Sequence, residues 1–300
     1  MKWTHFKTRV PAKWVLSGEH AVLRGATAIA IPHSSMGLEL EFDPDFQPDF
    51  QKDRQIQVEP QSAQPLIREL LESIGESWEF GDRSFKMPVG RLKIESSIPI
   101  GAGLGSSAAL CVALTRWISQ PTNIGGPEQI ELAKTLEHRF HGRSSGMDVA
   151  VISKGEPIAF TMEGPKIKSI GIKKLPRFTF HDTGLRARTS ECVLRVEKFR
   201  EEIPLVALKI DEAMGEASRY ALEGLVRYDA GAEKEGLALL QKGMNQAREC
   251  FYAWELMPGQ AKRLEEDLLK QGALSVKMTG AGGGGMIVAL WGPLSSVKSQ

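Results

Sequence analysis

Cysteine is scarce in this chain, and its scarcity excludes two kinds of scaffold. The 300 residues contain three cysteines, at positions 111, 192 and 250. A disulfide framework or a zinc site needs several cysteines at close and regular spacing, which three scattered thiols do not provide. We therefore expect each thiol to be a small buried or surface side chain in a reducing compartment, and not a nucleophile.

Long apolar runs and an excess of one charge are also missing. No charge-free apolar run reaches the roughly 18 residues of a membrane span, and the first ten residues lack the apolar core of a signal peptide. Lys plus Arg number 38 against 37 Asp plus Glu, so no global field favours nucleic acid or an anionic membrane. The sequence predicts a cytoplasmic protein without nucleic-acid or membrane partners, which binds any anion locally, and it leaves a homodimer open.

What is present is the pattern of a two-domain α+β protein. A length of 300 residues suggests two domains, and the character of the chain changes near residue 172. We predict domains at 1–172 and 173–300, because the second part starts and ends with strands around long helices. The expected elements are strands at 37–42, 91–95, 177–180, 274–278 and 286–291, and helices at 66–74, 106–118, 127–140 and, in several pieces, 203–271.

A cluster of glycines stands directly in front of the helix expected at 106–118. Residues 98–110 read IPIGAGLGSSAAL, which is neither a Walker A loop nor a good dinucleotide fingerprint. Bare backbone in front of a helix N-terminus nevertheless suits a phosphate. Ser106 and Ser107 fall in the first helical turn, where each can cap the helix or offer a hydroxyl to a phosphate or a metal. Phosphate binding and a plain N-cap with packing glycines both remain open on these residues alone.

A second glycine cluster lies near the end of the chain. Residues 277–285 read KMTGAGGGG, between two strand-like segments. Taken alone, such a run is typical of a flexible hairpin. Two clusters far apart in one sequence favour a shared anion site over two unrelated turns.

Three segments together resemble the GHMP kinases, a family of small-molecule kinases. They are PAKWVLSGEHAVLRG at 11–25, PIGAGLGSSAA at 99–109 and KMTGAGGGG at 277–285. The segments occur in the family's order and spread over nearly the whole chain. The resemblance implies a two-domain α+β GHMP kinase fold, with a ribosomal protein S5 domain 2-like N-terminal domain and a ferredoxin-like C-terminal domain.

Within the family, two further stretches look most like those of mevalonate kinases. They are GEHAV at 18–22 and HGRSSGMD at 141–148, and residues 182–189 resemble a later substrate-side segment more loosely. The sequence departs from that pattern at Ala12, where glycine is common, at Val149, where asparagine is frequent, and at 154–157, which replaces two glycines. The run GMDVA at 146–150 resembles phosphomevalonate kinases instead.

The resemblance implies the substrates and the metal. ATP and an acceptor alcohol would bind between the domains, and the γ-phosphoryl group would pass to a primary hydroxyl with the help of Mg²⁺. Mevalonate is the expected acceptor, with phosphomevalonate or a related acid as the alternative. Two other classes stay open, a nicotinamide-dependent oxidoreductase and a catalytically inactive nucleotide-binding protein. Extra cations for phosphomevalonate would come from Lys93, Arg139, Arg143, Arg186 or Arg188.

The resemblance also implies roles for individual residues. Asp148 corresponds to the family's catalytic aspartate and would accept or orient the hydroxyl proton. Lys13 corresponds to the active-site lysine and, beside Asp148, would lower the pKa of that carboxyl. The loop that wraps the nucleotide phosphates would consist of Gly101, Ala102, Gly103, Leu104, Gly105, Ser106 and Ser107, and we expect Gly283, Gly284 and Gly285 to brace it.

The resemblance also implies which residues bind the metal and which contact the acceptor. Ser107 and Glu137 would hold Mg²⁺, which prefers hard oxygen ligands. Glu137 stands near the C-terminal end of its helix, where the dipole disfavours a carboxylate, so that a bound cation, Lys134 or Arg139 would compensate it. The expected acceptor contacts are Glu19, His20, Ser145 and Thr189, although His20 also fits a buried structural histidine.

Overall fold

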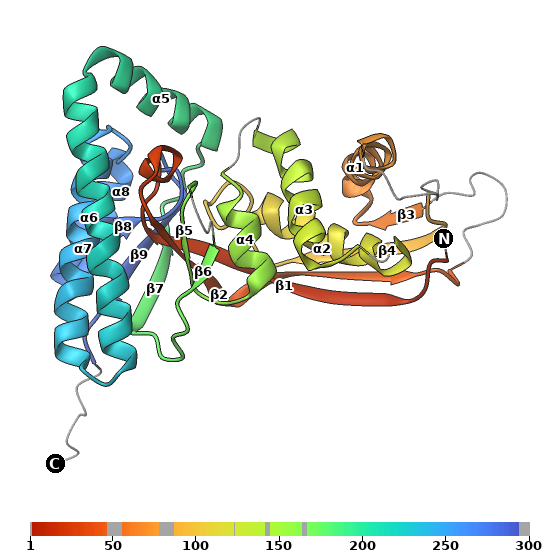
Figure 1. Ribbon diagram of the computed structural model, residues 1–300, viewed down its shortest axis with the longest axis horizontal. Coiled ribbons are helices and arrows are strands. Elements are labelled where there is room, and N and C mark those ends of the chain that lie inside the picture. The colour runs from red at the N-terminus through yellow and green to blue at the C-terminus, as the bar shows by residue number, and fades with distance from the viewer. Residues whose placement is uncertain are drawn as a thin grey trace. The chain divides into compact units, whose positions relative to one another are not determined.

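The computed structural model describes residues 2–46, 56–77, 87–122, 124–141, 145–163 and 167–293, which form two compact units. Unit 1 consists of Met1–Ala12, His33–Pro99 and Gly105–Gly155, and unit 2 of Lys13–Pro32, Ile100–Leu104 and Glu156–Gln300. Each unit combines helices with strands (Figure 1), which confirms the predicted α+β class. The predicted domain boundary at residue 172 stays a prediction.

The sheet of unit 1 is built on alternating apolar and polar residues. Strand β2 (Ala28–Asp43) pairs with β1 (Phe6–Ser17) and, antiparallel, with β4 (Gly90–Ser96), while β3 (Ile56–Glu59) pairs parallel with β4. The register places Leu40 opposite Ile94 and Phe42 opposite Leu92. Leu38, Leu40 and Phe42 of β2 therefore face the core, as the period of a half-buried strand requires.

Helices cover one face of this sheet (Figure 1). They are α1 (Gln64–Ser77), α2 (Ser106–Thr122), α3 (Gly126–His141) and α4 (Met147–Lys154), and a short 3₁₀ turn, η2 (Gln61–Ala63), precedes α1. Helix α2 is buried over most of its length because it is rich in Ala and Leu. Its Trp117 is fully buried and packs against Phe42 of β2 with the ring centroids 4.8 Å apart and the ring planes tilted by 45°. The apolar packing of α2 on the sheet holds the N-terminus of this helix in a defined position.

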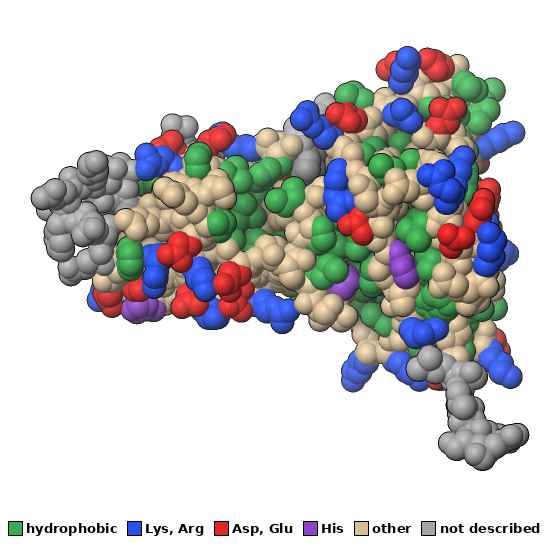
Figure 2. All heavy atoms as spheres, turned by 180° about the vertical axis from the view of Figure 1, so that it is seen from behind, with side chains coloured by type: hydrophobic (Ala, Val, Ile, Leu, Met, Phe, Trp, Pro, Cys, Tyr) green, Lys and Arg blue, Asp and Glu red, His purple; other side chains and the backbone are tan. Residues whose placement is uncertain are grey.

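The opposite face of the same sheet carries charges of both signs, interleaved along the strands (Figure 2). Lys7 of β1 lies 2.8 Å from Glu39, and Lys93 lies 2.7 Å from Glu95. Exposed pairs of this kind add little stability, and they keep a broad sheet face soluble. Lys93 is thus engaged on the solvated face of the sheet.

Unit 2 contains an antiparallel sheet in the order β7-β9-β8. Strand β9 (Met286–Trp291) pairs with β7 (Arg177–Asp182) from Asp182↔Met286 to Arg177↔Trp291, and with β8 (Ser275–Met278) on its other edge. Two short strands, β5 (Ile158–Phe160) and β6 (Ile167–Ser169), pair with each other, and β5 also pairs with the start of β2. A 3₁₀ turn, η1 (Ala21–Arg24), follows β1.

Four helices complete unit 2: α5 (Thr189–Glu202), α6 (Pro204–Asp229), α7 (Glu233–Ala253) and α8 (Gly259–Lys270). Helices α6 and α7 lie side by side (Figure 1) and touch through glycines. A Cβ on Gly224 would lie 2.9 Å from the carbonyl oxygen of Gly236, and one on Gly243 would lie 2.7 Å from that of Ala217. The absence of these side chains lets the two backbones approach closely.

The cysteines behave as the sequence predicts. Cys111, Cys192 and Cys250 are all buried and free of disulfides. Burial raises the pKa of each thiol, to about 12 for Cys250, and so disfavours the reactive thiolate. Among the described residues, no helix combines the length and the apolar character that crossing a bilayer requires.

Candidate active site

The first two segments of the family resemblance meet within unit 2. Lys13 lies on β1 with 3% of its surface exposed, and its backbone N–H donates to the carbonyl oxygen of Leu104 at 3.0 Å. Its ammonium donates to the carbonyl oxygen of Gly103, also at 3.0 Å. The lysine therefore holds the glycine loop with both its main chain and its side chain.

The third segment braces the same loop with bare backbone. A Cβ on Gly103 would lie 2.8 Å from the carbonyl oxygen of Thr279, and one on Gly285 would lie 2.6 Å from that of Ala102. The N–H of Met286 donates to the Ala102 oxygen at 3.1 Å. Gly103 and Gly285 have φ values of 78° and 87°, which side chains rarely tolerate. The expected bracing role is thus confirmed for Gly285.

Gly283 and Gly284 pack elsewhere than the sequence suggests. A Cβ on Gly283 would lie 2.9 Å from that of Ala187, and one on Gly284 would lie 3.0 Å from the Leu185 backbone. These two glycines therefore brace the segment that leads into α5, and not the phosphate loop itself. The prediction that treated all three glycines alike is wrong for them.

The segment between β7 and α5 flanks the loop on another side. The side chain of Arg186 passes Gly101, where a Cβ would lie 3.3 Å from its Cδ, and its Nε donates to the Ile100 carbonyl at 3.2 Å. Its guanidinium also binds both carboxylate oxygens of Asp182, and these hydrogen bonds lower the pKa of Asp182. Thr189, an expected acceptor contact, is the exposed first residue of α5. Its contact with the acceptor stays a prediction.

Glu19 forms a buried ion pair that the sequence did not reveal. Its Oε1 lies 2.6 Å from the ammonium of Lys277, and the two residues are 4% and 0% exposed. Burial raises the pKa of Glu19 and lowers that of Lys277, because desolvation disfavours both charges. A lysine inside the buried strand β8, at the start of the segment 277–285, was the available signal for this partner.

His20 ties the first segment to the third. Its Nε2–H donates to the carbonyl oxygen of Ala281 at 2.8 Å, and its ring packs edge-on against Trp254 with the centroids 5.1 Å apart. Burial lowers the pKa of His20 to about 4, so the ring is neutral at pH 7. The residue adopts a φ of 59°, which is rare outside glycine and is held here by these contacts. These contacts favour the alternative of a buried structural histidine, and substrate contact by His20 or Glu19 stays a prediction.

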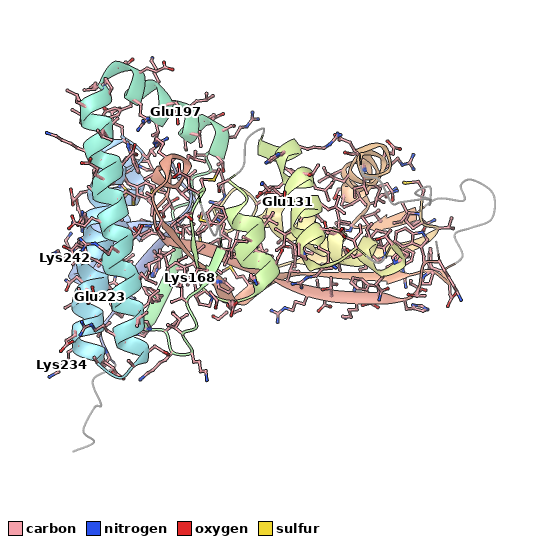
Figure 3. All side chains as sticks on the ribbon, viewed as in Figure 1. Glu131, Lys168, Glu197, Glu223, Lys234 and Lys242 are labelled. Carbon is pink, nitrogen blue, oxygen red and sulfur yellow. The ribbon has the colours of Figure 1, made fainter. Side chains whose placement is uncertain are left out.

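The turn after His20 is fixed to two helices by charge. Arg24 binds Asp211 of α6 through Nε at 2.9 Å and Glu197 of α5 through Nη1 at 2.8 Å. Glu197 projects from α5 (Figure 3), and Arg200 of the same helix also bonds Asp211. This network joins the first segment to the helix that begins at Thr189.

The residues expected to hold the metal lie in unit 1, on neighbouring helices. Ser106 and Ser107 open α2, whose first turn closes with a hydrogen bond of 2.9 Å from the Ala109 N–H to the Gly105 oxygen. Glu137 of α3 is 2% exposed, and after burial its charge is the next cause of the raised pKa of Cys111. Cys111 stands one turn after Ser107 on α2, the helix against which α3 packs.

This donor set fits a magnesium ion. A hydroxyl and a buried carboxylate are the hard oxygen ligands that Mg²⁺ accepts beside phosphate oxygens and water. The two cations weighed as partners of Glu137 have other neighbours. Lys134 lies 3.7 Å from Glu131 and packs against Gly146, and Arg139 lies 3.9 Å from Glu69.

Asp148 stands in the first turn of α4, also in unit 1. Gly146 caps this helix with a φ of 80°, a left-handed conformation that suits glycine, and the Met147 N–H donates to the Ser145 hydroxyl oxygen at 3.2 Å. Ser145 therefore helps to start the helix, and the helix dipole favours a carboxylate at the position of Asp148. Residues 142–144 of the 141–148 stretch, Arg143 among them, lie outside the described part of the chain. The predicted proximity of Asp148 to Lys13 stays a prediction.

Comparison with known proteins supports the family resemblance, and the two family models cover both glycine clusters. The model of the GHMP kinases N terminal domain matches residues 66–156, and that of the GHMP kinases C terminal domain matches residues 222–298. A mevalonate kinase of Pyrococcus furiosus is 31% identical, with 93% of this chain and 87% of that protein covered. A mevalonate kinase of Aeropyrum pernix is 28% identical, covering 95% of this chain and 88% of its own length.

Solved structures show the same fold. The L. major mevalonate kinase in complex with R-mevalonate matches with a TM-score of 0.73 and 24% identity, covering 97% of this chain and 88% of that one. The Methanococcus jannaschii mevalonate kinase matches with a TM-score of 0.70 and 20% identity, covering 97% and 92%. The two-domain fold expected from the resemblance is confirmed, and the kinase class is favoured over a nicotinamide-dependent oxidoreductase. With the lysine, the two glycine clusters and both family models in agreement, this chain belongs to the GHMP kinases and phosphorylates an alcohol group with ATP.

Proposed function

We propose that this enzyme is a mevalonate kinase, which transfers the γ-phosphoryl group of ATP to the primary hydroxyl of mevalonate. One observation carries the proposal: three segments far apart in sequence converge on the backbone of residues 102–104, with Lys13 donating to Gly103. The similarity to proteins named mevalonate kinase supports the choice of acceptor, because it extends over 93% of the chain.

The nucleotide phosphates bind along residues 101–107. Gly101, Gly103 and Gly105 have φ values of 72°, 78° and 74°, and the side chains between them, those of Ala102 and Leu104, are buried, so the exposed part of the loop is largely backbone. The N–H groups of the first turn of α2 and the hydroxyls of Ser106 and Ser107 continue this surface. The loop residues thus supply donors for phosphate oxygens, which is most of what phosphoryl transfer asks of a protein.

Ser107 and Glu137 hold the magnesium ion. Their place on adjacent helices of unit 1 and the burial of the Glu137 carboxylate support this assignment. Bound there together with ATP, Mg²⁺ would supply positive charge against the phosphate oxygens. The carboxylate of Glu137 and the hydroxyl of Ser107 would be its protein ligands.

Asp148 and Lys13 act on the acceptor. The Asp148 carboxylate orients the hydroxyl and takes its proton as the oxygen attacks the γ-phosphorus, while the bond from that phosphorus to the β,γ-bridging oxygen breaks and ADP leaves. The ammonium of Lys13 stabilises the negative charge that develops during the transfer. Ser145 and Thr189 contact the acceptor, whereas the buried contacts of Glu19 and His20 hold the first segment in shape.

The choice of mevalonate over phosphomevalonate rests on the relatives and not on the basic residues, whose exposed ion pairs are weak. A second phosphate would require cations that are available to it. Each of the four described candidates has a carboxylate within 4 Å, with distances of 2.7 Å for Lys93, 3.9 Å for Arg139, 2.6 Å for Arg186 and 3.9 Å for Arg188. Arg143 lies outside the described residues. The acceptor proposed here carries no phosphate and makes no such demand.

A parallel assay of acceptors tests the proposal. ATP consumption is measured with mevalonate, phosphomevalonate, homoserine and galactose under the same conditions, and we expect turnover with mevalonate at least about a hundredfold above the others in kcat/KM. A preference for phosphomevalonate would replace the proposed acceptor by the alternative. No turnover with any acceptor would favour the non-catalytic nucleotide-binding protein. The predicted cytoplasmic location and a homodimer are separate proposals, for fractionation and sedimentation to test.

A further inference from the structure

Lys277 is a fully buried cation held entirely by unit 2. Its ammonium donates to Oε1 of Glu19 at 2.6 Å, to the carbonyl oxygen of Met278 and, at 3.4 Å, to that of Val15. Thr279, the residue directly after β8, accepts from the Val15 N–H at 2.8 Å and donates to the Val15 carbonyl oxygen at 3.0 Å. Side-chain hydrogen bonds thus connect the end of β8 to β1, the strand that also carries Lys13.

Only one of the two carboxylate oxygens of Glu19, the partner of Lys277, accepts a hydrogen bond. Oε2 of Glu19 is buried and has no hydrogen-bond partner among the described residues. A buried carboxylate with an open acceptor attracts any cation within reach, because water cannot compete for it. Lys13 is such a cation: it lies on β1 two residues before Val15, whose carbonyl oxygen accepts from Lys277, and its charge opposes the burial that raises the pKa of Glu19.

Two lysines therefore face one carboxylate, yet only one of them binds it. Lys277 occupies Glu19, and the ammonium of Lys13 bonds the loop at Gly103 instead. A buried pair is neutral overall, so the field of Glu19 at Lys13 is largely cancelled. Without the Lys277 charge, the same carboxylate would pull on the Lys13 ammonium in a medium of low dielectric constant.

We propose that Lys277 is a positioning residue, which neutralises Glu19 and thereby keeps the ammonium of Lys13 on the glycine loop. The inference rests on the proposed role of Lys13 in phosphoryl transfer. It assigns Lys277 no contact with ATP or acceptor. The loss of Lys277 would act through Glu19, whose negative charge would then attract the ammonium of Lys13.

A set of substitutions tests the proposal through Lys13. We expect Lys277→Met to lower kcat at least about tenfold with the Kd of ATP changed less than about threefold, as for Lys13→Met. Glu19→Gln removes the competing charge, so adding Lys277→Met to Glu19→Gln should change kcat less than about threefold from that of Glu19→Gln alone. In the Lys13→Met background, Lys277→Met should lower kcat no further, because its effect passes through the missing lysine.

Controls separate positioning from stability. Arg248→Met breaks another partly buried pair of unit 2, in which Arg248 lies 3.4 Å from Glu265. It should lower the melting temperature while leaving kcat unchanged. If Lys277→Met does not give folded protein, the kcat of the double variant alone tests the proposal. The double variant leaves neither charge of the Glu19–Lys277 pair buried. A folded double variant whose kcat falls at least about tenfold below that of Glu19→Gln, a Lys277→Met variant with normal kcat, or additive losses with Lys13→Met would each overturn the proposal.

The failure of this inference is distinguishable from failure of the proposed function. The acceptor assay on the unsubstituted enzyme identifies the acceptor first, and the variants are compared with whichever alcohol it phosphorylates. A different acceptor changes the function and leaves the comparison among variants intact. Normal mevalonate turnover combined with any of the overturning outcomes would remove only the role of Lys277.

Discussion

The ammonium of Lys13 donates a hydrogen bond of 3.0 Å to the carbonyl oxygen of Gly103. A side chain that bonds a loop carbonyl has a defined position, which a free lysine on a surface strand lacks. The same lysine holds the next residue of the loop through its backbone. The cation that we assign to phosphoryl transfer is therefore placed by the loop that we assign to the phosphates.

Replacing Lys13 should impair chemistry more than nucleotide binding. We expect Lys13→Met to lower kcat at least about a hundredfold, because a preorganised charge near the reacting phosphoryl group is lost. The backbone bond from residue 13 to Leu104 remains, so the Kd of ATP should change little. Steady-state kinetics and calorimetric titration with ATP measure the two quantities. Lys7→Met removes an exposed lysine from the same strand and should leave both unchanged.

Asp148 should be needed for turnover and dispensable for folding. Asp148→Asn keeps the shape of the side chain and removes the group that accepts the hydroxyl proton, so kcat should fall at least about a hundredfold. Asp267→Asn, which removes an exposed carboxylate from α8, serves as the matched control. Near-normal turnover of Asp148→Asn, with an unchanged circular dichroism spectrum, would remove Asp148 from the mechanism.

Gly103 should tolerate no side chain, for two reasons that a control separates. Its φ of 78° costs an alanine about 1–2 kcal/mol, and the new Cβ would also lie 2.8 Å from the Thr279 carbonyl oxygen. Gly171 has a φ of 70° with open space around it, so Gly171→Ala should show the cost of conformation alone. Urea unfolding of both variants measures this difference. Only Gly103→Ala should weaken ATP binding, and equal effects of the two substitutions would contradict the crowding.

The Ser107 hydroxyl should matter for the metal. Ser107→Ala is expected to raise the Mg²⁺ concentration at half-maximal activity about tenfold, since one hard ligand is lost. Ser107→Thr retains a hydroxyl and should recover most of the affinity. Titration of activity with Mg²⁺ at saturating ATP gives the comparison, and identical metal dependence of Ser107→Ala and the original enzyme would refute the assignment.

His20 should make the fold sensitive to acid. Burial lowers its pKa from 6.5 to about 4, so the unfolded chain binds a proton that the folded chain refuses between these values. Stability from this group is complete above the unfolded pKa and falls as the pH drops toward 4, by up to about 3 kcal/mol. His20→Gln should flatten this part of the profile. The free energy of unfolding in urea at pH 7 and pH 4.5 measures it, and equal slopes for both proteins would contradict a buried neutral ring.

The sequence predicts the helices and strands of the core well because their patterns are local. The expected helix at 106–118 is α2, Ser106–Thr122, and the expected strand at 286–291 is β9. Strand β1 was missed, since its apolar run holds buried Lys13 and lacks clean alternation. Tertiary burial, and not local propensity, makes that segment a strand.

The site was predictable as segments and not as contacts. Glycines at 103 and 285 signal bare backbone, yet only the fold shows that they meet the backbone of other segments. Glu19 was placed near the acceptor because its segment resembles a substrate-side motif. Its ion pair with Lys277 spans 258 positions of sequence, and no local pattern encodes such a partner.

The glycine contacts between α6 and α7 restrict how the chain can change in length. Each residue added to a helix turns everything after it by roughly 100°. One insertion between Ala217 and Gly224 of α6 would thus rotate one contact out of line with the other, since Gly236 and Gly243 stay fixed on α7. The hairpin at 230–232 carries no such constraint, so natural variation in length should gather there and spare both helices.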